Sequence, residues 1–299
     1  MTLGNPLVTV LVPAYNVAEY VDEALGGVLT QDFTDFELLV IDDGSTDDTS
    51  KHLAAIDDPR LRVIHQENTG LVGALNRGFD EARGTYLARM DADDLMPTGR
   101  LAAQVAAMQD DPGLAACGTD YEMFGAVTGR VRMPRSDRAC RQRLLLATCH
   151  CGASLMIQRS VLDGAGIRFR PEYAHAEDYR LIVELSAHGR LRNLPIVGYR
   201  YRIHPTQVST LHSAEQRRAH LAIARDHVAS EGRRQLPDHV LEALLWPPRP
   251  SGPKPVATAR AFGQMLVPAW SAGIRAPGLE TGRFVARKVY ESAAATATA

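Results

Sequence analysis

The first part of the chain alternates short apolar runs with segments whose apolar residues recur every three or four positions. Continuous apolar runs are typical of strands buried on both faces of a parallel sheet, and the longer spacing is typical of amphipathic helices. The pattern predicts strands over residues 8–13, 36–41, 61–65 and 85–90, with helices over 17–29, from about 46 and from about 70. This alternation indicates a doubly wound, mostly parallel α/β sheet, in which ligands bind beyond the carboxyl ends of the strands.

The second half of the chain has a less regular pattern. It predicts helices over 98–110, from 160 and from 176, and strands over 113–119, 153–157 and 196–201. The arginine-rich stretch 130–143 has no clear period and is interpreted as a loop with some helix. Further on come a basic helix over 214–228, a stiff proline-rich connector over 246–255 and a helical stretch over 257–274. We therefore predict an α/β domain over 6–212 and a helical, proline-interrupted extension over 213–299 with a disordered end.

The composition is that of an ordinary globular protein. Of the 299 residues, 23% are charged and 45% are hydrophobic, and the formal net charge is −2. Because there is no global excess of basic residues, we expect no nucleic-acid partner. The amino terminus has no basic segment followed by an apolar run, and no stretch approaches the ~18–20 apolar residues that a membrane-spanning helix needs. We therefore expect a cytoplasmic protein.

The sequence contains four cysteines: Cys117, Cys140, Cys149 and Cys151. Cys149 and Cys151 have a Cys-x-Cys spacing around His150, and no second pair lies at the distance of a zinc finger. Nothing in the sequence indicates secretion, so disulfides are not favoured. We interpret all four as free thiols in a reducing compartment.

Three carboxylates, Asp91, Asp93 and Asp94, stand at the end of the strand predicted over 85–90. Carboxylates this close repel one another, and each favours hydration over burial. A hard divalent cation explains their placement, because such a cation takes oxygen ligands and is often bridged to substrate phosphates. An acidic loop that caps the next helix explains the stretch equally well when it is taken alone.

Two more polar segments follow predicted strands, at residues 13–16 and 42–45. Because the carboxyl ends of parallel strands meet at one edge of a sheet, we expect both segments to lie near Asp91. A second acidic pair, Glu177 and Asp178, opens the helix predicted from residue 176. Its alternative interpretation is a helix amino terminus whose charges suit the helix dipole.

These segments, taken in order, resemble the family 2 glycosyltransferases, which are inverting enzymes with the GT-A fold. The matching segments are Val-Pro-Ala-Tyr-Asn at 12–16, Val-Ile-Asp-Asp-Gly-Ser-Thr-Asp at 40–47, Asn-Thr-Gly at 68–70, Ala-Leu-Asn-Arg-Gly at 74–78, Met-Asp-Ala-Asp-Asp at 90–94 and Ala-Glu-Asp-Tyr at 176–179. The resemblance covers roughly residues 6–210 and leaves the last part of the chain without a counterpart.

The resemblance implies a binding site for a nucleotide-diphosphate sugar. The residues implied for it are Pro13, Tyr15, Asn16, Asp43, Asn76, Arg77, Asp91 and Ala92. Asp43 accepts a hydrogen bond from the imide N–H of the base, which favours a UDP- or dTDP-sugar because uracil and thymine carry that donor. An Asp-Gly turn remains the plain interpretation of residues 42–44, and an exposed helix surface remains that of Arg77.

The resemblance also implies a metal and a catalytic base. Asp93, with Asp91, holds Mn²⁺ or Mg²⁺ against the diphosphate, and His204 completes the metal shell or holds a phosphate. Asp178 is the base, and Glu177 orients the acceptor or raises the pKa of Asp178. In and just after the late strand, Arg200 or Arg202 is expected to offset the charge of the phosphates. One departure is a histidine that relatives carry just before residues 152–156, for which His150 comes slightly early.

Other functions fit the sequence less well. A sugar nucleotidyltransferase needs a glycine-rich loop with a basic residue after the first strand, and Pro13-Ala14-Tyr15-Asn16 stands there instead. A nucleotide-sugar-binding protein without catalysis is disfavoured because the aspartates implied for donor, metal and base are all present. The acceptor stays open between a glycan, a lipid-linked sugar and a small molecule. The apolar stretch 262–274, with basic residues after it, either contacts a membrane surface peripherally or packs on the first domain.

Overall fold

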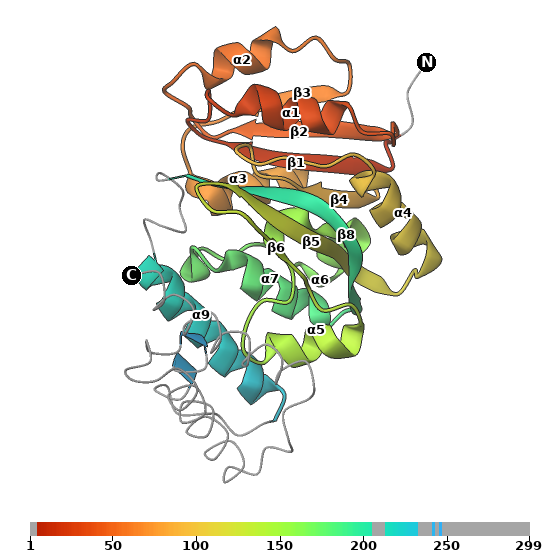
Figure 1. Cartoon of the computed structure of the whole chain (residues 1–299), viewed down its shortest axis with the longest axis vertical. Coiled ribbons are helices and arrows are strands. Elements are labelled where there is room, and N and C mark those ends of the chain that lie inside the picture. Colours follow the sequence, from red (N-terminus) through yellow and green to blue (C-terminus); the bar gives the residue numbers. More distant parts are fainter. Residues whose placement is uncertain (1–4, 205–212, 233–240, 243–244, 247–299) are drawn as a thin grey trace.

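The computed structural model describes residues 5–204, 213–232, 241–242 and 245–246 (Figure 1). Within that part of the chain, eight strands form one mixed sheet. Seven of them follow the order β3-β2-β1-β4-β7-β5-β6, and β8 pairs with β5. The sheet carries helices on both faces, so the predicted α/β class is confirmed (Figure 1).

The amino-terminal half is the parallel βα unit that the hydrophobic pattern predicts. Its parallel strands are β1 (Val8–Ala14), β2 (Phe36–Asp42), β3 (Leu61–His65) and β4 (Tyr86–Arg89). The helices between them are α1 (Val21–Leu29), α2 (Thr49–Ala55) and α3 (Gly70–Glu81). β1 lies between β2 and β4, and the register pairs Ala14 with Asp42 and Leu11 with Arg89. The carboxyl ends of these three strands therefore share one edge.

The second half departs from a doubly wound parallel sheet. Its strands are β5 (Leu114–Gly125), β6 (Gly129–Val131), β7 (Met156–Gln158) and β8 (Arg190–Ile203). β7 runs antiparallel to both β4 and β5, β6 is antiparallel to β5, and β8 is parallel to β5. The strand predicted over 153–157 is partly wrong, because Gly152–Ser154 forms a 3₁₀ turn, η1. β5 extends past residue 119, where the predicted strand ended. The outer half of β5 is only partly buried, so it lacks the apolar run that marks the start of the strand.

The remaining elements are α4 (Arg100–Asp110), α5 (Asp137–Leu144), α6 (Arg159–Ala165), η2 (Pro171–Tyr173), α7 (Glu177–Ser186) and α9 (Ser213–Ser230). Alternate side chains of each strand point to opposite faces of the sheet and pack against the two helical layers. Val10 packs in one apolar core with Leu25 of α1 and Leu101 of α4. Leu11 packs in the other, with Leu75 of α3 and residues of α5, α6 and α7. Burial on both faces explains why the parallel strands are continuously apolar.

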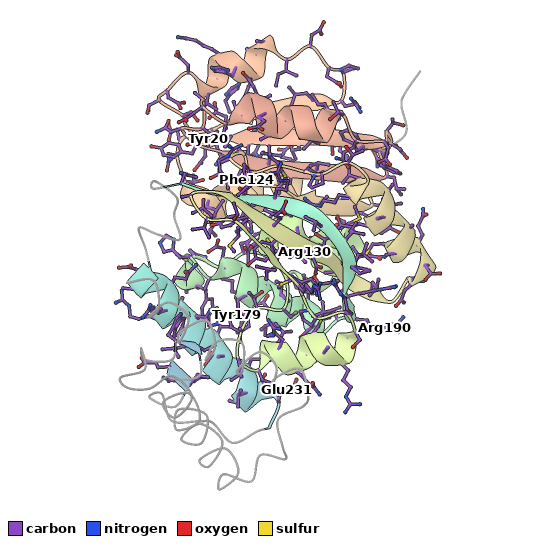
Figure 2. All side chains as sticks on the ribbon, viewed as in Figure 1. Tyr20, Phe124, Arg130, Tyr179, Arg190 and Glu231 are labelled. Atoms are coloured by element: carbon purple, nitrogen blue, oxygen red, sulfur yellow. The ribbon has the colours of Figure 1, made fainter. Side chains whose placement is uncertain are left out.

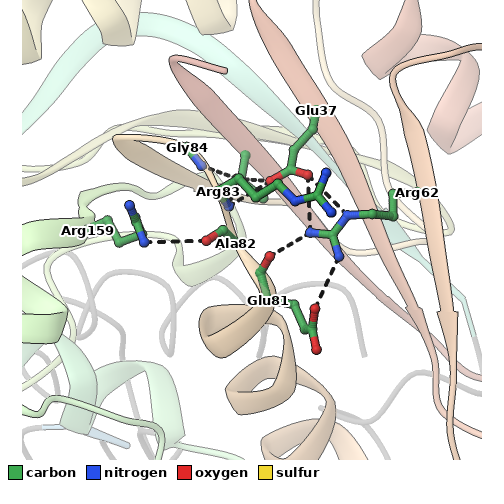
Figure 3. A network of polar contacts seen from close by, with 8 residues as sticks. Glu37, Arg62, Glu81, Ala82, Arg83, Gly84 and Arg159 are labelled. Carbon is green, nitrogen blue, oxygen red and sulfur yellow. Dashed lines mark hydrogen bonds and ion pairs between the residues drawn. The ribbon is translucent and has the colours of Figure 1, made fainter. Parts of the chain in front are cut away.

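A polar network closes the amino-terminal edge of the parallel strands, at the opposite end from the site described below (Figure 3). Glu37 of β2 is buried, and its Oε1 accepts hydrogen bonds from Thr9 Oγ1 at 2.6 Å and from the backbone N–H of Arg83 at 2.8 Å. Arg62 of β3 donates to Glu37 Oε2 at 3.2 Å and to the carbonyl oxygen of Glu81 at 2.6 Å. The network ties the end of α3 to β1, β2 and β3.

Helix α9, the first helix of the predicted extension, lies against the α/β domain. Gln216 donates to the carbonyl oxygen of His175 at 2.9 Å, and the ring of His220 lies 4.7 Å from that of Tyr179. The stretch 262–274 and its proposed membrane contact lie outside the described residues. No helix in the described ranges is long and apolar enough to cross a membrane. The domain boundary at 212/213 stays a prediction.

Candidate active site

The polar segments that follow β1, β2 and β4 lie at one edge of the sheet, as the strand order requires. Tyr15 and Asn16 follow β1 directly, and the Tyr15 side chain is 48% exposed. Asn16 has a left-handed backbone with φ of 53°, and its Oδ1 accepts a hydrogen bond from the N–H of Thr46 at 2.8 Å. The loops after β1 and β2 are therefore locked together, with the Tyr15 ring facing solvent.

Asp43, which follows β2, is held by three hydrogen bonds that all fall on the same oxygen. Oδ1 accepts from Gln66 Nε2 at 2.7 Å, from the Thr69 N–H at 2.9 Å and from Thr69 Oγ1 at 3.1 Å. Among the described residues, none of the hydrogen bonds uses Oδ2. Its neighbour Asp42 turns the other way and accepts from Ser50 and His65. The Asp-Gly turn thus fixes Asp43 in one orientation and occupies half of its carboxylate.

Arg89, the last residue of β4, joins the two acidic motifs. Its side chain is only 6% exposed, and one guanidinium nitrogen donates to Asp178 Oδ1 while the other donates to Asp91 Oδ1 at 3.0 Å. Burial acts to lower the pKa of Arg89, but the charges of Asp178 and Asp91 outweigh it and raise that pKa well above its usual value. The guanidinium therefore stays charged and holds α7 next to the end of β4.

The two other carboxylates after β4 have different partners. Asp93 Oδ2 lies 3.1 Å from His204 Nε2, at the end of β8, and Tyr20 of the α1 entry lies with its ring centroid 5.2 Å from that of His204. Burial, followed by the charge of Asp91, raises the pKa of Asp93. Carboxylate oxygens suit Mn²⁺ or Mg²⁺, and Mg²⁺ in particular commonly uses one or two carboxylates plus substrate phosphates. The side chains present thus fit the metal that the sequence predicts.

Asp94 is a structural residue in this arrangement. It is buried, and it bonds to the Tyr199 hydroxyl and to the Arg202 N–H, the latter at 2.6 Å. Burial and, after it, the charge of Asp93 raise the pKa of Asp94 to about 8. Arg202 also donates to the carbonyl oxygen of Asp93 at 2.7 Å, whereas Arg200 pairs with Glu122. Of Arg200 and Arg202, the two arginines that the sequence suggested, only Arg202 has a side chain that contacts the acidic loop in the hydrogen bonds of the described residues.

The second acidic pair opens helix α7, as predicted. The side chain of Asp178 is 27% exposed, and burial raises its pKa although the charge of Arg89 opposes this. Glu177 is buried, its Oε2 has no hydrogen-bond partner among the described residues, and burial and the charge of Asp178 raise its pKa to about 7. Gly152 of η1 packs against Asp178, and a β-carbon at residue 152 would overlap that carboxylate. Asp178 is thus fixed from two sides, by Arg89 and by η1.

Two residues implied for donor binding are engaged elsewhere in the fold. Asn76 of α3 exchanges two hydrogen bonds of 2.9 Å with the backbone of Phe169, and Arg77 pairs with Glu81 at 2.8 Å with its side chain 52% exposed. Neither contacts the carboxylates in the part of the chain that is described. Their role toward the donor stays a prediction.

His150 does not join the acidic cluster. It is buried, its Nε2 lies 3.1 Å from the carbonyl oxygen of Arg192, and burial lowers its pKa to about 4. Gly152, two residues later, is the residue that contacts Asp178. His150, which comes slightly early in the sequence for the histidine of relatives, therefore lies away from the acidic cluster, and Gly152 is the residue beside Asp178.

Comparison with known proteins agrees with this geometry. Residues 9–164 match the model of the family named Glycosyl transferase family 2. The chain belongs to this family. An uncharacterized glycosyltransferase of Haemophilus influenzae is 30% identical over 75% of this chain and 73% of its own length. The succinoglycan biosynthesis protein ExoO of Rhizobium meliloti is 32% identical over 68% of this chain, which spans 63% of that relative.

Solved structures share the fold of this glycosyltransferase. Staphylococcus aureus TarS, residues 1–349 in complex with UDP-GlcNAc, has a TM-score of 0.63 at 17% identity and covers 88% of this chain and 72% of its own. Mannosyltransferase PcManGT from Pyrobaculum calidifontis, in complex with GDP-Man and Mn²⁺, has a TM-score of 0.62 at 21% identity and covers 100% of this chain and 82% of its own. The GT-A fold predicted from the sequence is therefore confirmed.

Sequence reasoning overlooked Arg89 and Gly152 as parts of the site. A signal for Arg89 was available, because an arginine inside an otherwise apolar buried strand requires a carboxylate partner. Gly152 carried no such signal, because its contact with Asp178 joins positions far apart in the sequence.

Proposed function

We propose that this glycosyltransferase moves a sugar from a uridine or thymidine diphospho-sugar to an acceptor hydroxyl with inversion, in a metal-dependent reaction. One observation carries the proposal: Arg89 bridges Asp178 and Asp91, so the residue that we propose as base and the predicted phosphate-side motif lie on either side of one cation. An inverting transfer needs a base on the face of the sugar opposite the leaving diphosphate, within reach of the same anomeric carbon.

The chain's own residues supply the remaining steps of the proposal. Asp43, held through Oδ1, leaves Oδ2 to accept the imide N–H of the base. Asp178 accepts the proton of the acceptor hydroxyl. At the same time the hydroxyl oxygen of the acceptor bonds to the anomeric carbon, and the bond from that carbon to the diphosphate breaks. Burial raises the pKa of Asp178, which makes its carboxylate a better acceptor for this proton.

Asp93 and His204, with Asp91, are the residues that would hold Mn²⁺ or Mg²⁺. The bound ion supplies positive charge that stabilises the departing diphosphate. Arg202, which contacts the backbone of Asp93, adds a second positive charge at this loop. The presence of Mn²⁺ and GDP-Man in PcManGT supports the metal and leaves the nucleotide to be tested.

The acceptor that we propose is a carbohydrate hydroxyl in polysaccharide or glycoconjugate synthesis. Its support is the relative named for succinoglycan biosynthesis. The family assignment favours glycosyl transfer over sugar nucleotidyl transfer.

Calorimetric titration of UDP, dTDP and GDP, each with and without Mn²⁺, tests the donor proposal. The wild type should bind UDP or dTDP only with Mn²⁺, and Asp93→Ala should abolish that binding. Preference for GDP would overturn the nucleotide assignment, and equal binding without metal would overturn the metal assignment. If no nucleotide binds, the non-catalytic interpretation takes precedence.

A further inference from the structure

A cluster of soft ligands lies buried outside the carboxylate site. Cys140 comes from α5, and Cys149 and His150 come from the segment that leads into η1. Their relative exposures are 0%, 0% and 1%. The two Sγ atoms and a ring nitrogen of His150 all lie within 4.8 Å of one another. The Cys-x-Cys spacing of Cys149 and Cys151 did not favour a zinc site in the sequence, whereas the fold places Cys140 beside Cys149 and His150.

The orientation of His150 suits a ligand. Its Nε2 lies 3.1 Å from the carbonyl oxygen of Arg192, and a carbonyl only accepts, so Nε2 carries the hydrogen. Nδ1 then presents its lone pair, and it lies 3.1 Å from Cys149 Sγ. Histidines that bind metals commonly donate their other ring N–H to a backbone carbonyl in this way.

Asn193 of β8 supplies a second, independent observation. Its Nδ2 donates to the carbonyl oxygens of Pro134 at 2.7 Å and Cys149 at 3.0 Å and lies 3.7 Å from Cys140 Sγ. Its Oδ1 is buried and has no hydrogen-bond partner among the described residues. A β-carbon at Gly118 would meet both this oxygen and Cδ2 of His150, so the orphaned acceptor lies on the Gly118 side of that ring. A buried acceptor without a donor is costly unless something satisfies it.

We propose that Cys140, Cys149 and His150 form a structural binding site for a thiophilic ion, Zn²⁺. Two thiolates balance the charge of the ion, so the buried site is neutral overall. Ligand atoms of a tetrahedral zinc site are about 3.5–3.8 Å apart, which the cluster reaches with side-chain shifts of about 1 Å or less. A fourth ligand, for which the oxygen of a water molecule would serve, completes the tetrahedron.

The ion acts at a distance from the substrates. It joins α5 to the segment that continues through Cys151 into Gly152, which packs against Asp178. The same part of α5 accepts a hydrogen bond from Tyr179, the neighbour of Asp178, at the carbonyl oxygen of Leu144 with a distance of 2.6 Å. Zinc would thereby stabilise α5 and η1, the elements packed around Asp178. Loss of the ion would lower the thermal stability of the protein before it affected nucleotide binding.

Metal analysis of the full chain, purified under reducing conditions without chelator, tests the proposal. We expect about one equivalent of zinc per chain in the wild type and a loss of at least tenfold in Cys140→Ser and Cys149→Ser. The matched control is Cys117→Ser, because Cys117 is equally buried but is not part of the ligand cluster. Asp93→Ala should keep its zinc, which separates this site from the donor site.

Three results would overturn the proposal. They are a wild type that takes up no zinc on incubation with the ion, a Cys149→Ser variant with unchanged zinc content, and an intact mass two hydrogens low that places a disulfide between Cys140 and Cys149. Should the variants not fold, cobalt(II) uptake by the wild type decides. A thiolate-to-cobalt charge-transfer band with tetrahedral visible transitions supports the site, and a spectrum without that band contradicts it.

Discussion

Gly152 and Asp178 are in such close contact that residue 152 has no room for a side chain. A β-carbon there would overlap Oδ2, Cγ and Cβ of Asp178. The carboxylate that we assign as the base is therefore positioned by the backbone of η1 as well as by Arg89. Because displacement of a reacting group by about 1 Å costs on the order of 10²-fold in rate, the contact is a direct means to test the assignment.

Gly152→Ala should lower kcat by about 10²-fold while the Kd for the donor nucleotide changes little. The added methyl group pushes Asp178 away without removing it. Steady-state kinetics and calorimetry on the same preparation separate the two effects. Gly164→Ala in α6 is the matched control, because a β-carbon there meets nothing within 4 Å. Equal losses in both variants would show that the effect is not specific to Asp178.

Asp178→Asn should reduce transfer by about 10²–10⁴-fold, the usual contribution of a general base, with donor binding retained.

Arg89→Met, in contrast to Asp178→Asn, should lower the free energy of unfolding by about 3 kcal/mol, because it leaves two carboxylates without their buried cation. Urea denaturation of both single variants and the double variant measures the coupling between them. Additive losses would contradict the bridge.

Glu177 gives the protein a dependence of stability on pH. Its pKa of about 7 in the folded state lies above the ordinary value of 4.5, so folding favours the protonated form. The stability from this group is complete below about pH 4.5 and is lost as the pH rises to about 7. Glu177→Gln mimics the protonated form and should raise the denaturation midpoint at pH 8 but not at pH 4.5. A wild type and variant with parallel pH profiles would contradict this account.

Asp43→Asn should weaken binding of UDP by at least about tenfold, or about 1.4 kcal/mol. The three donors on Oδ1 keep the amide oxygen in that place, so the new NH₂ group takes the place of Oδ2. It then opposes the imide N–H donor to donor. Calorimetry with UDP measures the loss, and unchanged affinity would show that the base is recognised elsewhere.

Glu37→Gln should reduce stability by about 1–3 kcal/mol without affecting kcat. The substitution removes charge from the network in Figure 3, which lies at the amino-terminal edge of the strands and far along them from Asp91. Chemical denaturation and activity at a temperature well below the transition check both halves of the expectation. A loss of kcat in the folded variant would indicate communication along the strands that the structure does not explain.

The parallel half of the fold was predictable because continuous apolar runs and helical spacing arise from burial on both faces of a sheet. The antiparallel half was not, since β6 and the outer part of β5 are only partly buried and carry no such period. Figure 2 shows side chains crowded around α7, which carries the buried Tyr179. Contacts in such a layer, among them those of Gly152 and Cys140, join distant positions and leave no local signal in the sequence.

The pairing of β4 with β7 forms a seam at which the parallel part of the sheet meets its antiparallel part. Residues proposed for the nucleotide, Tyr15, Asn16 and Asp43, precede the seam in the chain, and Gly152 and Asp178 follow it. Arg89 is the last residue of β4, and its side chain reaches across the seam to donate a hydrogen bond to Asp178. Under the proposed assignments, a recombinant enzyme joined between residues 95 and 114 would take Asp43, Asp91 and Asp93 from one parent and the base Asp178 from the other. It would work only if both parents kept that arginine and its aspartate.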